Sequence, residues 1–498
     1  MLSMLAALLA LLSILQICAD QLPASLYTYS PSWPVTEWDA AGNYTWVLKQ
    51  RARDAGLSYV GSNERLRLAV QRMKEGKPTK VVTIGGSITA GQGASDNKNW
   101  PLWLFTMLKK QYGSHVAGHN GAMAGALSAY MSACHNVHVP KSADIIFVEY
   151  SVNDQAVALP VFDNAMRRPY ERLLRKLLKY PNRPAVVLVH TYVHSMATPL
   201  PGVFYNSAER EMQEFALYYG LPSISVKAAV FPLMVANVPG FMPSPPRLTD
   251  EKGLKLKAFY FDPVHPDGNT GCRVIAELVY HLILHTAADI SSRPVDGDDT
   301  AVAAASLAPP MVPDNHESAS DKCFIGMQFT GRVTAKQGFE WVNESKTPRP
   351  KFGMVATEPG SRLEISVDTT AGGPTAKAGA MVVVELAHLK SYENMGKASV
   401  ACEGGCTCQS TTLDGHTTLR NSQLHLHQFY VSQAADCKIV VTVLAETSSG
   451  KNKVKLAGIT ISEEPGDTAG MRNDQALNYA HDISMRGEDG VFEVMNHA

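Results

Sequence analysis

A serine follows a buried apolar strand early in the chain. Val81-Val82-Thr83-Ile84 runs directly into Gly85-Gly86-Ser87-Ile88-Thr89. The glycines allow a tight turn and close substrate approach, and a helix N-terminus beyond the turn favours developing negative charge, so Ser87 suits nucleophilic chemistry. A phosphate-binding turn is the alternative, but the G-x-G-x-x-G and G-x-x-x-x-G-K-[ST] spacings are both absent.

Three other segments carry residues suited to the same chemistry. The run Asn120-Gly121-Ala122-Met123-Ala124-Gly125 is a small-residue loop whose backbone N–H groups can face a ligand, and Asn153 follows a strand that ends near Tyr150. Asp262 stands three residues before His265, a spacing that places both side chains on one side of a turn. If the strands form a parallel sheet, all four segments lie at its carboxyl edge. Open α/β folds bind their ligands at this edge.

In this order, the four segments resemble the signature blocks of the SGNH (GDSL-type) esterase superfamily. The resemblance implies that Ser87 is the nucleophile, His265 the general base and Asp262 the acid that orients the imidazolium. It also implies an oxyanion hole made by the backbone N–H groups of Ser87 and Gly125 and the side-chain amide of Asn153. It implies neither a cofactor nor a metal.

The resemblance covers roughly Thr79 to Leu284 and has two departures from the family pattern. Family members usually carry Asp directly before the serine, where this chain has Gly86, and Gly at the start of the third block, where this chain has Ser151. Neither position supplies the nucleophile, the base or an oxyanion donor, so both departures are compatible with activity. They indicate a divergent branch of the superfamily.

Neighbouring residues offer alternatives for two of these roles. Gly121 is the alternative to Gly125 as oxyanion donor, and Asp267 is the alternative to Asp262 as orienting acid. The three-residue spacing to the histidine favours Asp262. Asp154 is interpreted as a structural cap or loop residue.

Two histidine pairs also require an interpretation. His190 and His194 flank a predicted strand end and are interpreted as loop histidines, with a place in the pocket as the alternative. His425 and His427 lie on one face of a predicted strand. With no carboxylate beside them, we interpret that face as solvated and not as a metal site.

The segment around the serine alternates short apolar strands with amphipathic helices. Strands are predicted at 81–84, 145–148, 185–189 and 224–226, and helices at 103–108, 167–178, 209–218 and 276–284, after a capped helix that starts near 62. The alternation predicts a mostly parallel sheet with helices on both faces. This agrees with the flavodoxin-like, three-layer α/β/α fold that the SGNH resemblance implies.

Beyond residue 290 the composition changes. Residues 291–320 are rich in Ser, Asp, Ala and Pro and predict a linker, and strand-like runs at 363–367, 381–386, 439–443 and 454–461 predict a β-sandwich-like accessory domain over 321–463. The full predicted division is a signal peptide at 1–19, an esterase domain at 20–290 with its core at about 79–285, the linker, the accessory domain, and a disordered tail at 464–498.

Three features predict export to the extracellular space or an endomembrane lumen. The apolar run from Leu2 to Cys18 predicts a signal peptide that is cleaved after Ala19, which leaves a mature chain without stable membrane insertion. Asn43 and Asn343 begin glycosylation acceptor triplets. Five of the seven remaining cysteines follow residue 320 and predict disulfides of an oxidising compartment.

The cysteine pattern leaves two questions open. A zinc site at Cys402, Cys406 and Cys408 is the alternative to disulfides, although Cys-x-Cys spacing is atypical of structural zinc. Seven is an odd number, so at least one thiol is expected to lack a partner within the chain. Cys134 and Cys272 lie outside the C-terminal group, and the sequence does not show whether they pair.

Together these features predict a secreted serine esterase. The formal net charge of −1 argues against nucleic-acid binding by bulk electrostatics. The expected substrate is an O-acyl ester of a small molecule or polysaccharide, with a carbohydrate O-acetyl ester preferred by analogy with enzymes that carry an appended β domain. The alternatives are an O-acyltransferase of the same fold and a catalytically weak protein that binds wall or matrix carbohydrate. A membrane-acting lipase ranks lower.

Overall fold

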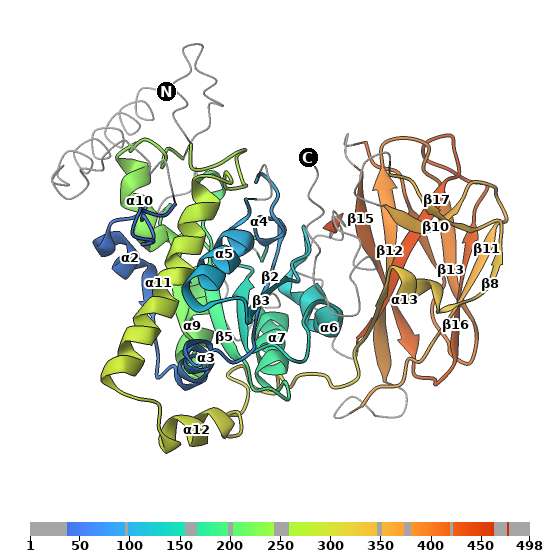
Figure 1. Ribbon diagram of the computed structural model, residues 1–498. Helices are drawn as coiled ribbons and strands as arrows, with labels where there is room; N and C mark the ends of the chain where they lie inside the picture. The colour runs from blue at the N-terminus through green and yellow to red at the C-terminus, as the bar shows by residue number, and fades with distance from the viewer. Residues whose placement is uncertain are drawn as a thin grey trace, which may run out of the picture.

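The structure of the protein is a computed structural model. It describes residues 37–94, 98–154, 167–197, 203–243, 258–345, 351–372, 380–418 and 422–462, and the short strand β18 (Ala476–Leu477). The predicted signal peptide and most of the predicted tail lie outside the described residues. An α/β domain comes first and an all-β domain follows it (Figure 1).

The α/β domain is built on a six-stranded sheet. Its strands are β1 (Leu57–Tyr59), β2 (Thr79–Gly85), β3 (Val116–Asn120), β4 (Ile145–Glu149), β5 (Ala185–His190) and β6 (Ser223–Ser225), in the spatial order β1-β6-β5-β4-β2-β3. Strands β2 to β6 are parallel, and β1 adds an antiparallel edge. Without β1 this is the flavodoxin-like order, in which the connections change direction between β2 and β4. The predicted fold class is confirmed.

Helices cover both faces of this sheet. One face packs against α3 (Glu64–Lys74), α5 (Trp100–Tyr112), α10 (Val226–Val235) and α11 (Gly271–Ser292), with α2 (Gln50–Gly56) at its rim. The other packs against α6 (Ser128–His138), α7 (Arg167–Leu178) and α9 (Glu209–Tyr219). Side chains alternate along each strand, so Val81 and Phe147 enter the first core and Val82 and Ile146 the second.

Two structural details differ from the sequence prediction. Strands β1 and β3 were not predicted, because neither is a continuous β-branched run: β3 reads Val-Ala-Gly-His-Asn. The capped helix near residue 62 begins at Glu64, but Asn63 adopts a left-handed conformation (φ 65°) and makes no side-chain cap. Its Nδ2 instead donates to Thr286 Oγ1 at 3.1 Å, so its role is to join two helices.

Helix α11 is the one described helix whose length and apolar composition suffice for a membrane span, and 61% of its most apolar window is buried inside the protein. It is the longest helix of the α/β core and packs against α3 and α5. Its composition therefore follows from its central place in the fold.

The segment at 291–320, predicted as a linker, packs along the α/β domain. It contains α12 (Gly297–Ala304), whose start is closed by a capping box between Asp296 and Asp299. The Asp299 carboxylate accepts hydrogen bonds from the fully buried Arg67 at 2.9 and 3.1 Å. Further along, Asn315 is fully buried and its Nδ2 donates to Glu171 on α7 at 2.6 Å.

The accessory domain is a sandwich of two antiparallel sheets. One contains β7 (Lys322–Ile325), β9 (Glu340–Asn343), β10 (Phe352–Ala356), β12 (Met381–Ser391), β15 (Ser422–Ser432), β17 (Val454–Ser462) and β18. The other contains β8 (Val333–Gln337), β11 (Arg362–Val367), β13 (Lys397–Gly404), β14 (Thr411–Asp414) and β16 (Cys437–Val443). Their facing side chains form one apolar core. The predicted all-β domain is confirmed.

Three disulfides fix this architecture. Cys402 pairs with Cys408 and Cys406 with Cys437 inside the accessory domain, and Cys134 of α6 pairs with Cys323 of β7 across the two domains. Cys272 is free and buried.

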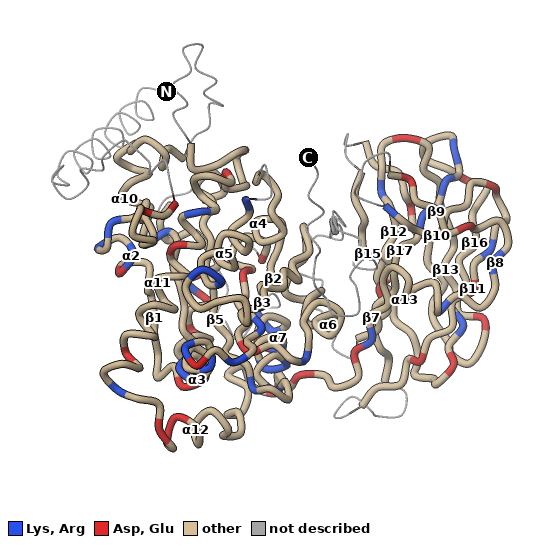
Figure 2. Tube along the Cα trace, in the orientation of Figure 1, with Lys and Arg blue, Asp and Glu red and all other residues tan. Residues whose placement is uncertain are grey.

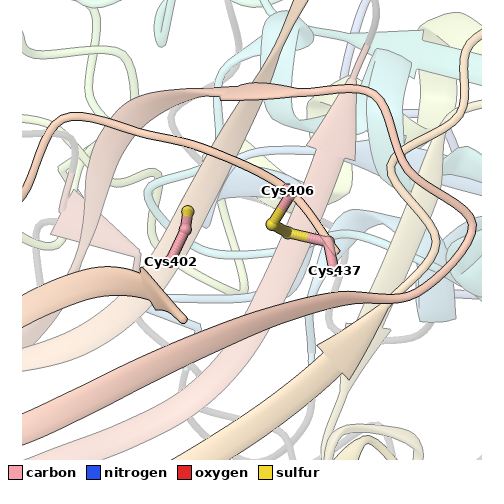
Figure 3. Close-up of side chains that lie close together, drawn as sticks. All are labelled: Cys402, Cys406 and Cys437. Atoms are coloured by element: carbon pink, nitrogen blue, oxygen red, sulfur yellow. A yellow bond between two sulfur atoms is a disulfide. The ribbon is translucent and has the colours of Figure 1, made fainter. Parts of the chain in front are cut away.

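The zinc alternative therefore does not apply. In the described part of the chain, Cys402, Cys406 and Cys437 are the one group of three or more His, Cys, Asp or Glu residues whose metal-binding atoms all lie within 4.8 Å of one another. Figure 3 shows Cys406 joined to Cys437, with Cys402 beside them. Sulfurs that are joined in disulfides are not thiolate ligands.

Candidate active site

Ser87, His265 and Asp262 form a continuous hydrogen-bonded chain. The Oγ atom of Ser87 lies 2.9 Å from Nε2 of His265. Nδ1 of the same ring lies 2.8 and 3.0 Å from the two carboxylate oxygens of Asp262. A hydroxyl, an imidazole and a carboxylate in this order provide a nucleophile, a proton acceptor and an orienting anion.

The carboxylate of Asp262 is held in its ionised form. Partial burial tends to raise its pKa, but hydrogen bonds from the backbone N–H groups of His265 and Val264 and from the His265 ring outweigh burial and leave the pKa below its usual value. Because Asp262 accepts from the ring at Nδ1, a neutral His265 carries its proton there. Its Nε2 is then free to accept a proton from Ser87.

Ser87 is placed by the end of β2. Gly85 is the last residue of that strand, Gly86 turns the chain, and Ser87 opens the short helix α4 (Ser87–Ala90). A Cβ on Gly85 would lie 2.6 Å from the backbone oxygen of Glu149, so only glycine fits between β2 and β4 here.

Glu149 is a buried acid beneath the serine turn that the sequence analysis did not identify. Its carboxylate accepts hydrogen bonds from Thr89 at 2.9 Å, from Thr191 at 2.5 Å and from the backbone N–H of Gly86. Burial raises the pKa of Glu149 despite these hydrogen bonds. Glu149 thus joins three strand ends directly below Ser87. A charged residue within the buried run Ile145–Glu149 was the available signal.

Helix α5 joins the serine turn to the histidine loop. Near its start, Trp100 Nε1 donates to Thr89 Oγ1 at 3.1 Å, and one turn later Trp103 Nε1 donates to the carbonyl of Gly268 at 2.9 Å. The histidine loop is closed by a hydrogen bond from Phe261 N to the carbonyl of His265 at 2.8 Å. The distance between nucleophile and base is therefore set by a helix and not by mobile loops.

The predicted oxyanion donors have their N–H groups available. Within the described residues, the backbone N–H groups of Ser87 and Gly125 make no hydrogen bond. Gly125 has φ +80°, a conformation that favours glycine. Gly121, the alternative donor, uses its N–H to bond the carbonyl of Thr83 at 2.8 Å, which leaves Gly125 as the available glycine of this loop.

Asn153 lies directly against the serine turn. A Cβ placed on Gly86 would be 1.9 Å from Asn153 Oδ1 and 2.4 Å from its Nδ2. The amide Oδ1 is buried without a hydrogen-bond partner in the described part of the chain. The amide oxygen and amide nitrogen of Asn153 thus lie beside the serine turn, between the ends of β2 and β4, where the connections of the sheet change direction.

The remaining predicted candidates lie elsewhere. Asp154 accepts hydrogen bonds from the N–H and Oγ of Ser128 at the start of α6, in agreement with a capping role. Asp267 accepts from the backbone N–H of Asn269 at 2.9 Å and makes no contact with His265 among the described interactions. Neither acid joins the serine–histidine pair.

The four other histidines that the sequence analysis singled out do not contact Ser87 or His265 among the described interactions. His190 is buried, and burial together with Lys227 lowers its pKa to about 3. His194 stacks on Phe231 with ring centroids 6.3 Å apart. His425 and His427 point from β15 into the sandwich, where His427 Nε2 lies 2.8 Å from Thr411 Oγ1. The expectation of a solvated face for these two is wrong, because both are only partly exposed.

Exposed aromatic side chains occur next to Asp262 and in the segment that precedes α9. Phe261, next to Asp262, is 40% exposed, and Phe204 and Tyr205 are 43% and 64% exposed. Phe204 packs edge-on against Phe231, with centroids 5.1 Å apart, in the same group as His194. The backbone N–H of His194 donates a hydrogen bond to the hydroxyl of Tyr260 at 3.3 Å.

The segment that carries Ser87, Asp262 and His265 is similar to a known family. Residues 83–268 match the model of the GDSL-like Lipase/Acylhydrolase family. No curated protein matches the sequence.

Two solved structures share the two-domain fold. A crystal structure of a two-domain esterase (CEX) active on acetylated mannans aligns with a TM-score of 0.58 and 18% identity, over 83% of this chain and 99% of that chain. The same esterase co-crystallised with mannopentaose gives 0.57 and 17%, over 83% and 98%. At these identities the likeness shows the fold. The family match therefore identifies residues 83–268 as a GDSL-like lipase/acylhydrolase domain, the kind of domain that carboxylic ester hydrolases carry.

Proposed function

We propose that this chain is a secreted carbohydrate O-acetyl esterase that works through a Ser-His-Asp triad. The observation that carries the proposal is the unbroken chain from Ser87 through His265 to Asp262. The esterase domain supports the reaction class, and the fold shared with an esterase active on acetylated mannans supports the carbohydrate alcohol.

The proposed reaction has two steps. Ser87 Oγ attacks the ester carbonyl while its proton moves to His265 Nε2, and the resulting oxyanion is bound by the N–H groups of Ser87 and Gly125 and the amide of Asn153. The intermediate collapses as His265 protonates the departing sugar oxygen, which leaves an acetyl group on Ser87. Water then attacks this acyl-enzyme, gives a proton to His265, and the proton returns to Ser87 as acetate leaves. Asp262 keeps the ring oriented throughout.

The exposed aromatic rings support a sugar as the alcohol. The apolar C–H face of a pyranose ring packs on an aromatic ring, and exposed apolar groups beside a catalytic site are typical of ligand contacts. Arg210 lies 4.6 Å from the Tyr205 ring centroid, and Lys227 lies 4.9 Å from that of Phe204. Each cation interacts with its ring and helps to hold it in place.

Disulfides and surface asparagines support export. Two disulfides lie within the accessory domain and one joins the two domains. Asn43 and Asn343 are both exposed, so an oligosaccharide can be attached at either position.

The first experiment does not require the natural substrate. The purified protein is treated with a fluorophosphonate probe and the label is located by peptide mass spectrometry, with Ser87→Ala and His265→Ala as test variants and Ser291→Ala, an exposed serine, as control. We expect label on Ser87 in the wild-type and control proteins only, and acetate release from acetylated mannan and xylan oligosaccharides. Absence of label in folded wild-type protein would contradict the triad and favour the carbohydrate-binding alternative. Transfer of acetyl to added sugar in place of water would identify the acyltransferase.

A further inference from the structure

The loop that carries Gly125 is fixed at both ends by buried hydrogen bonds. We call residues 121–127 the Gly125 loop. At its start, the carbonyl of Gly121 lies 2.9 Å from His138 Nδ1, and the Nε2 atom of the same ring lies 3.0 Å from the Tyr130 hydroxyl. At its end, Asp154 binds the N–H of Ser128 at 3.0 Å. Between these anchors the loop belongs to neither a helix nor a named strand.

The middle of the loop is enclosed between two different parts of the molecule. Ala122 and Ala124 pack against Ala90 of the serine helix α4. Met123 and Ala126 belong to a separate buried group, which we call the interdomain cluster. Its members are Met123, Ala126, Tyr130 and Cys134 from the α/β domain and Cys323, Ile325, Leu424 and Ala457 from the accessory domain.

The accessory domain is held against this loop by a covalent bond and by packing. Cys134 of α6 is joined to Cys323 of β7, with 5.2 Å between their Cα atoms. Figure 1 shows α6 between the central sheet of the α/β domain and the strands of the sandwich. Met123 is 3% exposed and Leu424 is 8% exposed, so each domain shields apolar atoms of the other.

We propose that the accessory domain is a positioning element of the esterase and that it holds the Gly125 N–H in place for the oxyanion. This inference rests on the proposed role of Gly125. Between Gly121 and Ala126 the residues are glycine or alanine except Met123, whose side chain is buried in the interdomain cluster. The backbone of Met123 is tied to β2 by a hydrogen bond from its N–H to the carbonyl of Gly85 at 3.0 Å, and its side chain belongs to the cluster that the accessory-domain strands complete. Seating of that domain therefore adds the side-chain packing that holds the middle of the loop.

This arrangement predicts that a displaced Gly125 loop lowers the turnover number and leaves substrate affinity unchanged. An oxyanion donor acts when it lies about 2.7–3.1 Å from the developing charge, and a misplacement of about 1 Å costs on the order of 100-fold in rate. The ground-state ester gains little from the same donor. Loosening the interdomain cluster is therefore expected to lower kcat and leave KM nearly unchanged.

Two variants of the full chain test this from the accessory side. Leu424→Ala removes packing against the loop, and the paired change Cys134→Ser with Cys323→Ser removes the covalent bond. Their controls are Leu413→Ala, in the sandwich core, and Cys402→Ser with Cys408→Ser, a disulfide within one domain. With an aryl acetate well below each melting temperature, we expect the test variants to lose about 10- to 100-fold in kcat with KM within about twofold. The controls lower Tm only, and Leu424→Met retains most of the activity.

Two results with Leu424→Ala would contradict the proposal. A folded Leu424→Ala protein with lowered Tm and wild-type kcat overturns the inference, as does a raised KM at constant kcat, which would assign the accessory domain to substrate binding. If the cysteine pair does not fold, Leu424→Ala and Met123→Ala decide the outcome. Gly125→Ala keeps the backbone N–H and disfavours the φ of +80° that presents it, so wild-type kcat in this variant would show that turnover does not depend on the shape of the loop at residue 125, whatever Leu424→Ala shows.

Discussion

The side-chain amide of Asn153 occupies the space that a Cβ on residue 86 would fill, since that Cβ would lie 1.9 Å from Asn153 Oδ1. Gly86 stands where the family usually carries aspartate. The departure is therefore coupled to the position of a proposed oxyanion donor: in this chain, the absence of a side chain at 86 lets the amide approach the serine turn.

Replacing Gly86 by alanine is expected to displace Asn153. We expect kcat on an aryl acetate to fall about 100- to 1,000-fold, the cost of losing one oxyanion donor, with the circular dichroism spectrum unchanged. Gly297→Ala is the matched control, because a Cβ there meets nothing within 4 Å. Full activity of Gly86→Ala would show that Asn153 can move without consequence for the reaction.

Asp262→Asn keeps the shape of the orienting side chain and removes its charge. The amide favours the wrong tautomer of His265, so we expect kcat to fall about 1,000- to 10,000-fold, as in other triads. Asp267→Asn, in the same loop, is expected to stay within about threefold of wild type. Steady-state kinetics on an aryl acetate measures both, and a larger loss in Asp267→Asn would reassign the acid.

Arg67→Met tests how the segment at 291–304 is attached. The side chains of Arg67 and Asp299 are 0% and 1% exposed, so the substitution leaves a buried carboxylate with only the exposed Arg293 at 3.7 Å as a cation. The free energy of unfolding is expected to fall by about 3–5 kcal/mol in urea titrations. Arg72→Met removes an exposed ion pair and is expected to cost less than about 1 kcal/mol. Equal costs would mean that the buried pair contributes no more than the exposed one.

His388 makes stability depend on pH. It lies in β12 opposite His425, with His427 and Lys390 also nearby, and burial followed by these neighbouring groups lowers its pKa to about 3. An unfolded histidine titrates near pH 6.5, so between about pH 6.5 and 3 the unfolded chain binds a proton that the folded chain does not.

Because the unfolded chain binds the extra proton, His388 makes the free energy of unfolding fall as pH falls from about 6.5 to 3. The fall is at most about 1.4 kcal/mol per pH unit. His388→Phe is expected to flatten the slope in urea titrations at pH 7, 6 and 5. His316→Phe replaces an exposed histidine and keeps the wild-type slope. An unchanged slope in His388→Phe would mean that this histidine is protonated in the folded domain.

Tyr205→Ala tests the proposed sugar contact. The ring is 64% exposed and lies outside the triad, so we expect kcat/KM for an acetylated polysaccharide to fall about tenfold while an aryl acetate is hydrolysed normally. Tyr430→Ala, an equally accessible ring on β15, is the control. Equal losses on both substrates would place Tyr205 in a structural role.

The sequence predicted what depends on local pattern. Continuous β-branched runs identified β2, β4 and β5, and the spacing of Asp262 and His265 identified two residues that the structure brings into contact. These features are local because a buried parallel strand and a short acid–histidine turn each depend on a few consecutive residues.

The features that sequence reasoning missed depend on distant residues. Glu149 is a buried acid because Thr89 and Thr191, far from it in the sequence, supply its hydrogen bonds. The partner of Cys134 was not readable, because pairing with Cys323 requires two domains to meet. Composition alone suggested a linker at 291–320, whereas its packing depends on Arg67 and Glu171.

The bond between Cys134 and Cys323 also orders events during biosynthesis. The two cysteines are 189 residues apart, and at about 5–20 residues per second roughly 10–40 s of translation separate them. Asp262, His265 and the strands β4, β5 and β6 are made within that interval, before the partner of Cys134 exists. The bond therefore cannot form before the first strand of the accessory domain has been synthesised, and a chain that stops short of residue 323 carries an unpaired Cys134 thiol on α6.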